Sequence, residues 1–373
     1  MRALGTLGIL LTLAIVAACT TTGDDGPRAD DEATGTAGTE ADPSPTATPV
    51  TEQPTPVPSG AMLRLDGIAA QQVVLWDSAL PAEFATTRYT LYHRSDARTW
   101  SRVDSLPTEG NLVADPTDPD RLYLGDHPPC LRGGDPVPFH RSEDGGESWQ
   151  EVPNAENIRP MTVLPDQPNV VIGSRCGLAI SQDYGVTWER HLPDSEFDLT
   201  RLTITEIGIF GTFTSHTEIS YLRRITIDDP DNPEFDEPIL SFWGTGAMHA
   251  TGERLIVGTI SGVHFSDDGG RTWSFTREGL DDVVASVDPL EQDIPEAEIE
   301  RGLGIHAVLP HPQQSSRIFL GTVRGLYLSE DNGESWGRIP EVDEREVRAL
   351  DFAMEGSILY VTTADGVIVL HNP

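Results

Sequence analysis

The stretch Ser329-Glu330-Asp331-Asn332-Gly333-Glu334-Ser335-Trp336 occurs four times, with small variations, in this chain of 373 residues. The other copies lie at 142–149, 181–188 and 266–273, and all four read S-x-D-x-G-x-[ST]-W. A degenerate fifth copy ends at Trp100, with Ser95 in place of the Asp and Ala97 in place of the Gly. Repetition at equivalent positions indicates architecture, because every unit of a repeat needs the same local structure.

The residue types of this motif are typical of a tight turn between two strands. An Asp carboxylate accepts hydrogen bonds from backbone N–H groups further along the turn, and a Gly adopts positive φ without a steric penalty. The Ser and Thr hydroxyls satisfy further turn groups, and the Trp buries a large apolar surface at the start of the next strand. We therefore predict structural, not catalytic, roles for Ser142, Asp144, Gly146, Trp149, Ser181, Asp183, Gly185, Trp188, Ser266, Asp268, Gly270, Trp273, Ser329, Asp331, Gly333 and Trp336.

Short apolar strand patterns precede each motif, such as 305–309, 317–321 and 325–329 before the last copy. Each unit therefore contains three such strands and a fourth strand that begins at the Trp. The units lie near 63–104, 110–153, 158–193, 200–230, 245–277, 303–340 and 346–371, and the fourth of them lacks the motif. This count favours a ring of seven units. A ring of six units is the alternative if the first unit is degenerate. The last unit lacks its fourth strand, which the residues just before the first unit could supply to close a ring.

The motif resembles the Asp-box, or BNR, repeat of sialidases, sortilin-type receptors and a photosystem II assembly factor. In those families the repeat lies on the blades of a β-propeller. The resemblance therefore implies an all-β fold, a propeller of seven or six blades, over residues 61–373.

The amino-terminal residues have the pattern of an export signal. One Arg is followed by an apolar run that ends at Ala18 and is too short to span a bilayer comfortably. Val16-Ala17-Ala18-Cys19 resembles a bacterial lipobox, which implies cleavage after residue 18 and lipidation of Cys19; the alternative is an ordinary signal peptide with an incidental cysteine. Residues 19–60, rich in Thr and Pro, are predicted to form a disordered tether. We expect an exported protein at the extracytoplasmic face of the cell membrane.

The formal net charge of −35 and the absence of Lys limit the chemistry of the chain. All its basic residues are Arg, which excludes Schiff-base and P-loop lysine chemistry. Binding to nucleic acid needs basic patches that release counterions, so we expect no nucleic-acid partner. We expect contact with the membrane only through the lipid anchor.

Two cysteines remain in the predicted propeller, Cys130 and Cys176, and they fall in matching loops of neighbouring units. Such loops share a face, and an exported protein favours a disulfide between them. The rival is a metal site that adds His127 and His140 to the two cysteines. We expect the disulfide, and neither a metal nor a cofactor. Calcium binding by the acidic run at 228–237 is a weaker hypothesis, because its spacing matches no EF-hand.

The function that these features favour is a non-catalytic binding or assembly scaffold for a protein or glycan on one propeller face. The alternative is a glycoside hydrolase of sialidase-like architecture. The resemblance would then require three arginines around a carboxylate, a Tyr nucleophile with an acidic partner, and an acid/base Asp. Ile158-Arg159-Pro160 is the string nearest to the Phe-Arg-Ile-Pro motif of sialidases, but it follows the second motif copy. Three convergent arginines at the channel mouth would favour the enzyme, and small or apolar lining would favour the scaffold.

Overall fold

The computed structural model describes the strands at 61–63, 72–74, 84–86 and 90–94 and most of residues 100–373. Gaps within 100–373 lie at 109, 129, 131–133, 192–196, 216–218, 245, 286–303, 343, 354–355 and 364–365. All described residues belong to one of the chain's two compact units, Gln53–Pro373. The predicted signal at 1–18, Cys19 and the tether at 19–60 lie outside the described residues. No helix in the described part of the chain is long and apolar enough to cross a bilayer.

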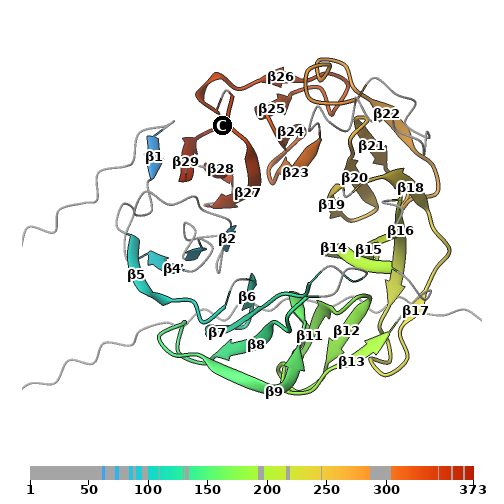
Figure 1. Cartoon of the computed structure of the whole chain (residues 1–373). Coiled ribbons are helices and arrows are strands. Elements are labelled where there is room, and N and C mark those ends of the chain that lie inside the picture. Colours follow the sequence, from blue (N-terminus) through green and yellow to red (C-terminus); the bar gives the residue numbers. More distant parts are fainter. Residues whose placement is uncertain are drawn as a thin grey trace, which may run out of the picture. The chain divides into compact units, whose positions relative to one another are not determined.

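The described strands form seven antiparallel sheets arranged in a ring, which confirms the all-β propeller and its seven blades (Figure 1). Blade 1 contains β2 (Gln72–Val74), β3 (Phe84–Thr86), β4 (Thr90–Arg94) and β5 (Trp100–Ser105); blade 2 contains β6 (Asn111–Asp115), β7 (Asp118–Gly125), β8 (Pro138–Ser142) and β9 (Gln150–Glu156); blade 3 contains β10 (Arg159–Leu164), β11 (Gln167–Ser174), β12 (Leu178–Ser181) and β13 (Glu189–His191). Blade 5 contains β19 (Ala247–Thr251), β20 (Arg254–Gly258), β21 (Val263–Ser266) and β22 (Ser274–Thr276); blade 6 contains β23 (Ile305–His311), β24 (Gln314–Thr322), β25 (Gly325–Ser329) and β26 (Gly337–Arg338), followed by the short 3-10 helix η1 (Pro340–Val342).

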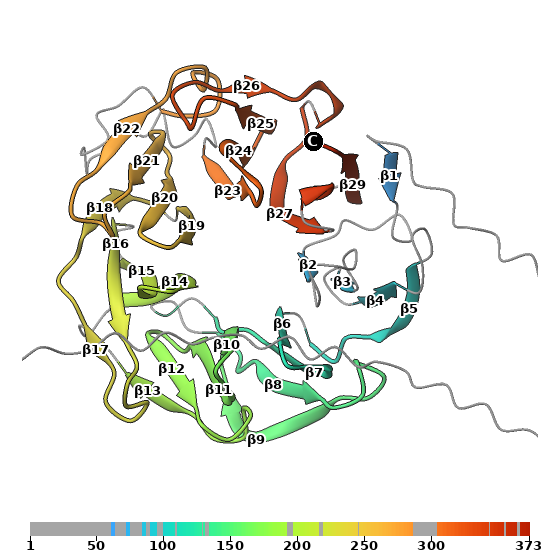
Figure 2. The same ribbon diagram turned by 180° about the vertical axis from the view of Figure 1, so that it is seen from behind.

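The ring closes between the two ends of the propeller. Blade 7 consists of β27 (Val347–Ala353), β28 (Ile358–Thr363) and β29 (Gly366–His371), and its fourth strand is β1 (Ala61–Leu63). β1 pairs with β29 through Ala61–Val369, Met62–Ile368 and Leu63–Val367. The closure predicted from the incomplete last unit is confirmed, and Figure 2 shows the two strands side by side from behind.

Blade 4, which lacks the motif as blade 7 does, has a different outer edge. It contains β14 (Phe197–Thr205), β15 (Gly208–Ser215) and β16 (Ile219–Thr226), and both β17 (Glu234–Phe235) and β18 (Leu240–Trp243) pair with β16. The predicted unit boundary at 230 is therefore too early. Without the motif turn after the third strand, the chain enters the acidic run at 228–237, pairs with β16 through β17 within that run, and pairs with it again through β18.

The four motif copies form nearly identical turns between the third and fourth strands of their blades. The Ser Oγ accepts the N–H of the Gly at 2.8 Å and donates to the Asp carboxylate at 2.7–2.8 Å. The other Asp oxygen accepts the hydroxyl of the following Ser or Thr at 2.5–2.7 Å. The Gly φ angles, 89, 80, 90 and 96°, lie in the region that favours glycine.

The core lies between neighbouring blades, where the apolar faces of the sheets meet. Blades 5 and 6 share one cluster, in which Phe265 and Ile256 pack against Val308 and Leu320. Trp336 is 6% exposed and belongs to this cluster, while the other three motif tryptophans are half-buried. Packing between sheets rather than within one sheet makes each blade depend on its neighbours.

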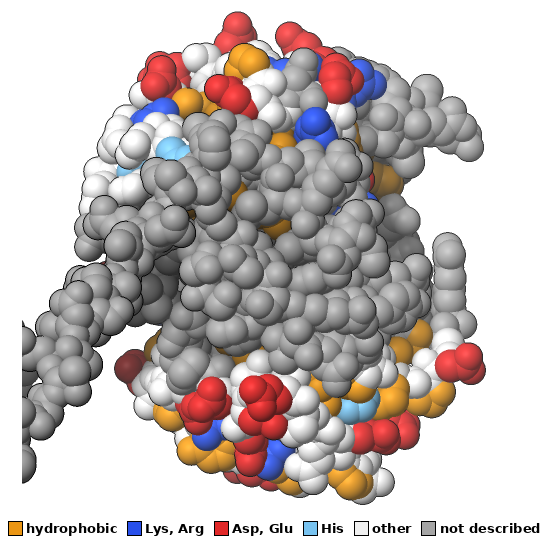
Figure 3. Space-filling view, turned by 90° about the vertical axis from the view of Figure 1, so that its left-hand side faces the viewer, with side chains coloured by type: hydrophobic (Ala, Val, Ile, Leu, Met, Phe, Trp, Pro, Cys, Tyr) orange, Lys and Arg blue, Asp and Glu red, His pale blue; other side chains and the backbone are white. Residues whose placement is uncertain are grey.

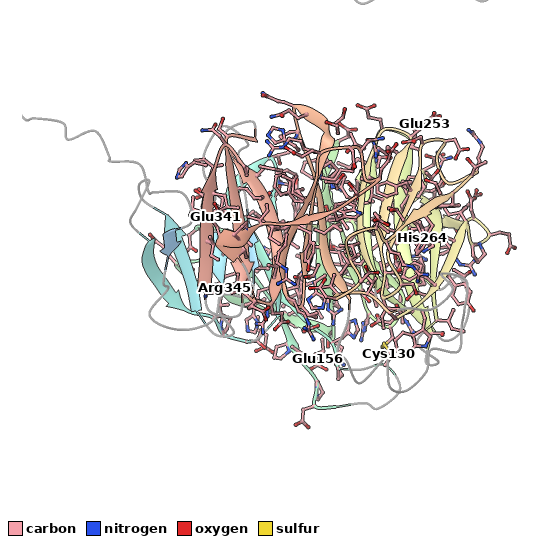
Figure 4. All side chains as sticks on the ribbon, turned by 90° about the horizontal axis from the view of Figure 1, so that it is seen from above. Cys130, Glu156, Glu253, His264, Glu341 and Arg345 are labelled. Atoms are coloured by element: carbon pink, nitrogen blue, oxygen red, sulfur yellow. A yellow bond between two sulfur atoms is a disulfide. The ribbon has the colours of Figure 1, made fainter. Side chains whose placement is uncertain are left out.

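The first strand of each blade lies innermost, and strand direction alternates outward, so the ring has two distinct faces. Inner strands begin on the face that carries the loops between second and third strands. They end on the face that carries the motif turns. Figure 4 shows Cys130, Glu156 and Arg345 along one face and Glu253 on the opposite one.

Candidate functional site

Cys130 and Cys176 form a disulfide with a Cα–Cα distance of 5.4 Å. Cys130 follows β7 in blade 2 and Cys176 follows β11 in blade 3, so the bond joins matching loops on one face. His127 lies beside it, with its Nδ1 4.0 Å from the Cys130 Sγ. The ligand atoms of His127, Cys130 and Cys176 lie within 4.8 Å of one another. His140 is not part of this group, so three of the four residues of the rival metal hypothesis come together, and metal binding would require the disulfide to be reduced first.

A polar network continues from the disulfide toward the ring centre. The buried His127 Nε2 lies 3.1 Å from the Ser174 Oγ and 3.2 Å from an Asp198 oxygen, and Ser174 donates to that oxygen at 2.7 Å. These hydrogen bonds outweigh burial and lower the pKa of Asp198. Both Ser174 and Asp198 contact the same ring nitrogen, so this is not a relay in which an acid orients a base toward a nucleophile.

The motif residues lie at the opposite end of the strands from this network. Their carboxylates are occupied by turn hydrogen bonds, and donation by Thr272 and by Ser335 lowers the pKa of Asp268 and of Asp331 to about 2. A carboxylate held ionised by its own turn is a poor proton donor.

A cavity of about 550 Å³ opens at the centre of the ring. It is lined near the starts of the inner strands of six blades: by Asn111 of β6, Arg159 and Met161 of β10, Thr200 and Arg201 of β14, Met248 of β19, His306 of β23 and Arg348 of β27, together with Asp126 beyond β7. We call Arg159, Arg201, Arg348 and His306 the cationic end of the channel. Three of its four side chains are guanidinium groups, which carry charge at any physiological pH.

Bulges in the inner strands direct several of these side chains. The register of β10, β14, β23 and β27 with its neighbouring strand shifts by one residue near the strand start. The extra residues are Met161, Thr200, His306 and Arg348, and all four line the cavity. A bulge leaves one residue unpaired and turns its side chain away from the alternation of the strand. The same irregularity in four blades therefore contributes four of the residues that line the channel.

The basic groups of the cationic end lie close enough to one another to shift each other's pKa values. Arg201 is solvent-exposed in the channel, yet the protein atoms that surround its guanidinium and the repulsion from Arg159 lower its pKa. Burial lowers the pKa of His306, and Arg201 and Arg348 add to this effect while Glu346 opposes it. Arg201 donates to the Thr200 carbonyl at 3.0 Å and has no carboxylate partner among the described residues.

The other two arginines have acidic neighbours. Arg159 Nε donates to Asp126 at 2.7 Å, and Arg348 lies 3.4 Å from Glu346. Arg201 is thus the guanidinium with unused capacity for an anion. Its planar fork of donors matches a carboxylate in two-point geometry.

The described lining of this cavity contains few of the groups that glycoside hydrolysis requires. Asp126 is its one carboxylate among the described lining residues, it is paired with Arg159, and no Tyr belongs to that lining. The three arginines of the sialidase criterion are present, whereas the nucleophile and the paired acids are not among these residues. The described lining residues offer guanidinium donors that suit an anion, and they do not include an acid, a base and a nucleophile within reach of one another.

Sequence reasoning singled out Arg159 only as part of a misplaced motif, and it missed Arg201, Arg348 and His306. One signal was present: a charged or polar residue within the first residues of an otherwise apolar inner strand, as in Gly304-Ile305-His306 and Glu346-Val347-Arg348. The calcium hypothesis for the acidic run at 228–237 gains no support, because among the described residues only His127, Cys130 and Cys176 bring three potential ligand atoms together.

The outer surface contrasts with this channel. In the face shown in Figure 3, the described surface carries Asp and Glu side chains in its upper and lower parts, with scattered basic groups. The formal charge of −35 makes such an exterior expected.

Known proteins resemble the chain in fold. Comparison with protein families finds no match, and neither does comparison with curated proteins. The chain is similar to a crystal structure of the GH74 xyloglucanase from Xanthomonas campestris, with 16% identity and a TM-score of 0.57 over 83% of this chain. It covers only about half, 52%, of that enzyme.

Two further structures are matched over nearly their full length. YCF48 from Cyanidioschyzon merolae has 14% identity and a TM-score of 0.57, with 83% of this chain and 98% of that one covered. YCF48 bound to D1 peptide has 13% identity and a TM-score of 0.55, with 84% and 96% covered. At these identities the similarity concerns the fold, and it is a β-propeller fold shared with an enzyme and with a peptide-bound protein.

Proposed function

We propose that the protein is an extracytoplasmic lipoprotein whose propeller is a binding or assembly scaffold for a protein or glycan. The observation that carries the proposal is the cationic end of the channel. Arg159, Arg201 and Arg348 converge there in a chain that is otherwise strongly acidic. A ligand that presents a carboxylate, such as a peptide carboxyl terminus or an acidic sugar, matches these guanidinium groups.

The acidic exterior supports this selectivity. Negative charge over the surface repels anionic molecules in general, and only a ligand that reaches the cationic end recovers that cost through short-range hydrogen bonds. The similarity in fold to YCF48 bound to D1 peptide supports a protein ligand, because that protein holds a peptide. The Asp-box motifs and the lipobox-like Val16-Ala17-Ala18-Cys19 support the assignment to an anchored Asp-box protein.

The proposal is tested by measuring binding to pairs of ligands that differ only in a carboxylate group. The full chain is applied to peptides that end in a free carboxylate or in an amide, and to glycans with and without sialic acid. A charged hydrogen bond contributes about 1.5–3 kcal/mol, so each carboxylate form should bind at least about tenfold more tightly than its neutral partner. Arg201→Gln should remove this preference.

Arg271→Gln is the matched control, because Arg271 lies in a motif turn at the opposite end of the strands and is exposed. It removes the same charge and should leave binding unchanged. If carboxylate and neutral forms bind equally, or if both variants lose binding to the same extent, the channel is not the binding site.

A glycoside hydrolase of sialidase-like architecture is the second candidate. The three convergent arginines favour it, as does the fold shared with a xyloglucanase. The test is turnover of a fluorogenic sialoside by the full chain. Release of fluorophore that is lost in Arg201→Gln would replace the scaffold proposal by the enzyme; binding without turnover supports the scaffold.

A further inference from the structure

A second cavity, of about 530 Å³, lies where three inner strands end. Its walls come from blades 5, 6 and 7 and include His249, Thr251, Leu309, Pro310, Asp351 and Phe352. His306 lies near the start of β23 at the cationic end, and His311 at the end of the same strand lines this second cavity. At about 3.3 Å per residue the two sites are roughly 16 Å apart. We call the second site the Asp351 cavity.

Asp351 is the one carboxyl group among the described residues that line this cavity. Its side chain has no side-chain partner in the described part of the protein. Burial raises its pKa to about 7, and the backbone N–H of Phe352 offsets only part of that effect. Near neutral pH the carboxyl is therefore close to half protonated, and it lacks a positive partner.

The other ionisable groups that face the cavity supply no such partner. Burial lowers the pKa of His249 to about 4, so the ring is neutral at pH 7, and its Nε2 lies 2.9 Å from the Thr251 Oγ1. Burial, with Arg317 adding to it, also lowers the pKa of His311, whose Nδ1 accepts the Gln313 N–H at 3.1 Å. Arg254 also lines the cavity, but its guanidinium is engaged outside it: it donates to Asn332 Oδ1 at 2.5 Å and lies 3.6 Å from an Asp267 oxygen.

The rest of the wall of the Asp351 cavity is mainly apolar, and two aromatic rings form part of it. The His311 ring lies against Phe352 with 5.1 Å between centroids, and Leu309, Pro310 and Ile256 complete the walls. Ligand cavities are commonly of this volume, with apolar walls and a few placed polar groups. Here the carboxyl and the His249 imidazole offer hydrogen-bond acceptors on apolar walls.

We propose that the Asp351 cavity binds a small organic cation, an amine carried on an apolar or aromatic body. The ammonium would pair with the Asp351 carboxylate while the body packs against Phe352, Leu309 and Pro310. An anion would lie beside the carboxylate and be repelled, and a neutral alcohol would leave the carboxyl without its charge partner. This site is separate from the cationic end and does not depend on the function proposed for it.

Binding of such a cation must release protons near pH 7. The ammonium favours the ionised carboxylate, so an Asp351 that is about half protonated when the cavity is empty gives up roughly half a proton per ligand. A neutral ligand of the same shape has no such effect. Proton release therefore distinguishes pairing with Asp351 from simple burial of the apolar body.

Calorimetry with the full chain and three matched compounds tests the proposal: 2-phenylethylamine, 2-phenylethanol and 3-phenylpropanoate. The amine should bind at least about tenfold more tightly than the alcohol, and the acid should bind least. Titrations at pH 7 in two buffers of different ionisation enthalpy should show release of about half a proton for the amine. Asp351→Asn should abolish both the preference for the amine and the proton release.

Asp166→Asn is the matched control, because Asp166 occupies the exposed turn between β10 and β11 on the same face of another blade. It should bind the amine as the wild type does. Equal affinities for amine and alcohol, absence of proton release, or an amine preference that persists in a folded Asp351→Asn variant would each overturn the proposal. If the wild type does not bind the amine but still binds carboxylate ligands at the cationic end, the proposal for the Asp351 cavity fails and the proposed function stands.

Discussion

Replacing Asp351 by Asn should stabilise the folded protein at high pH. The pKa of this carboxyl is raised from 3.8 to about 7 in the folded state. Folded protein therefore holds a proton that the unfolded chain has lost, and stability falls as the pH rises from about 4 to about 7. At about 1.4 kcal/mol per pKa unit, the full shift sets an upper bound of about 4 kcal/mol on the penalty above pH 7.

The actual gain from Asp351→Asn should be smaller, because the side chain is half-buried and keeps some contact with water through the cavity. We expect about 2 kcal/mol at pH 8, with little difference from the wild type at pH 4.5, where the folded-state carboxyl is neutral. For a domain of this size, 2 to 4 kcal/mol corresponds to roughly 3–6 °C in Tm.

Thermal unfolding followed by far-UV circular dichroism between pH 4.5 and pH 8 provides the measurement. Asp331→Asn is the comparison of opposite sign, because hydrogen bonds from Ser335 hold the pKa of Asp331 at about 2. Its contribution is present above pH 4 and is lost as the pH falls toward 2, so this variant should be less stable than the wild type at neutral pH. A Tm difference for Asp351→Asn that is constant with pH, or negative at pH 8, would refute the reasoning.

Three further outcomes follow from the described structure and the sequence. Replacing Cys130 and Cys176 by Ser opens a link between residues 46 apart and should lower stability by about 2–4 kcal/mol, which a Tm measurement with and without a thiol reductant on the wild type will check. Gly333→Ala should cost about 2–4 kcal/mol by denaturant unfolding, because the new Cβ meets the Phe265 ring and φ is +96°; an unchanged midpoint would contradict the packing described for blades 5 and 6. Metabolic labelling with a fatty acid should mark the wild type and leave Cys19→Ser unlabelled, and equal labelling would remove the lipid anchor.

The fold was predictable because its determinants are local. Each motif copy carries its own hydrogen bonds, from Ser181 to Asp183 for example, so eight residues suffice to define a turn. The short apolar runs before each turn are typical of strands in a sheet that is buried on its faces. Even the closure of blade 7 by β1 could be inferred, since the last unit lacked an outer strand. Blade 4 was the least accurately predicted, because no tight turn marks its outer edge.

The channel lining could not be predicted in the same way, because it depends on register. A bulge at Arg348 or His306 shifts which side chains face the cavity, and nothing in a strand pattern reports a one-residue slip. Convergence of Arg159 with Arg201 also joins different blades, which only ring geometry brings together. Asp351 did leave a signal, as a single acid in the apolar run Ala349-Leu350-Asp351-Phe352-Ala353.

The inner strands explain how one ring can hold two sites of opposite character. Each inner strand pairs with one neighbour, the second strand of its own blade, and its side chains near either end line the channel cavities. β27 carries Arg348 near its start and Asp351 three residues later, and the two face different cavities. Because apolar clusters between neighbouring blades hold the ring together, a substitution of a channel side chain at one end changes the local charge without disturbing the packing that keeps the other end in place. Independent responses of the two ends to Arg201→Gln and Asp351→Asn are therefore a property of the architecture, whatever ligands the two sites bind.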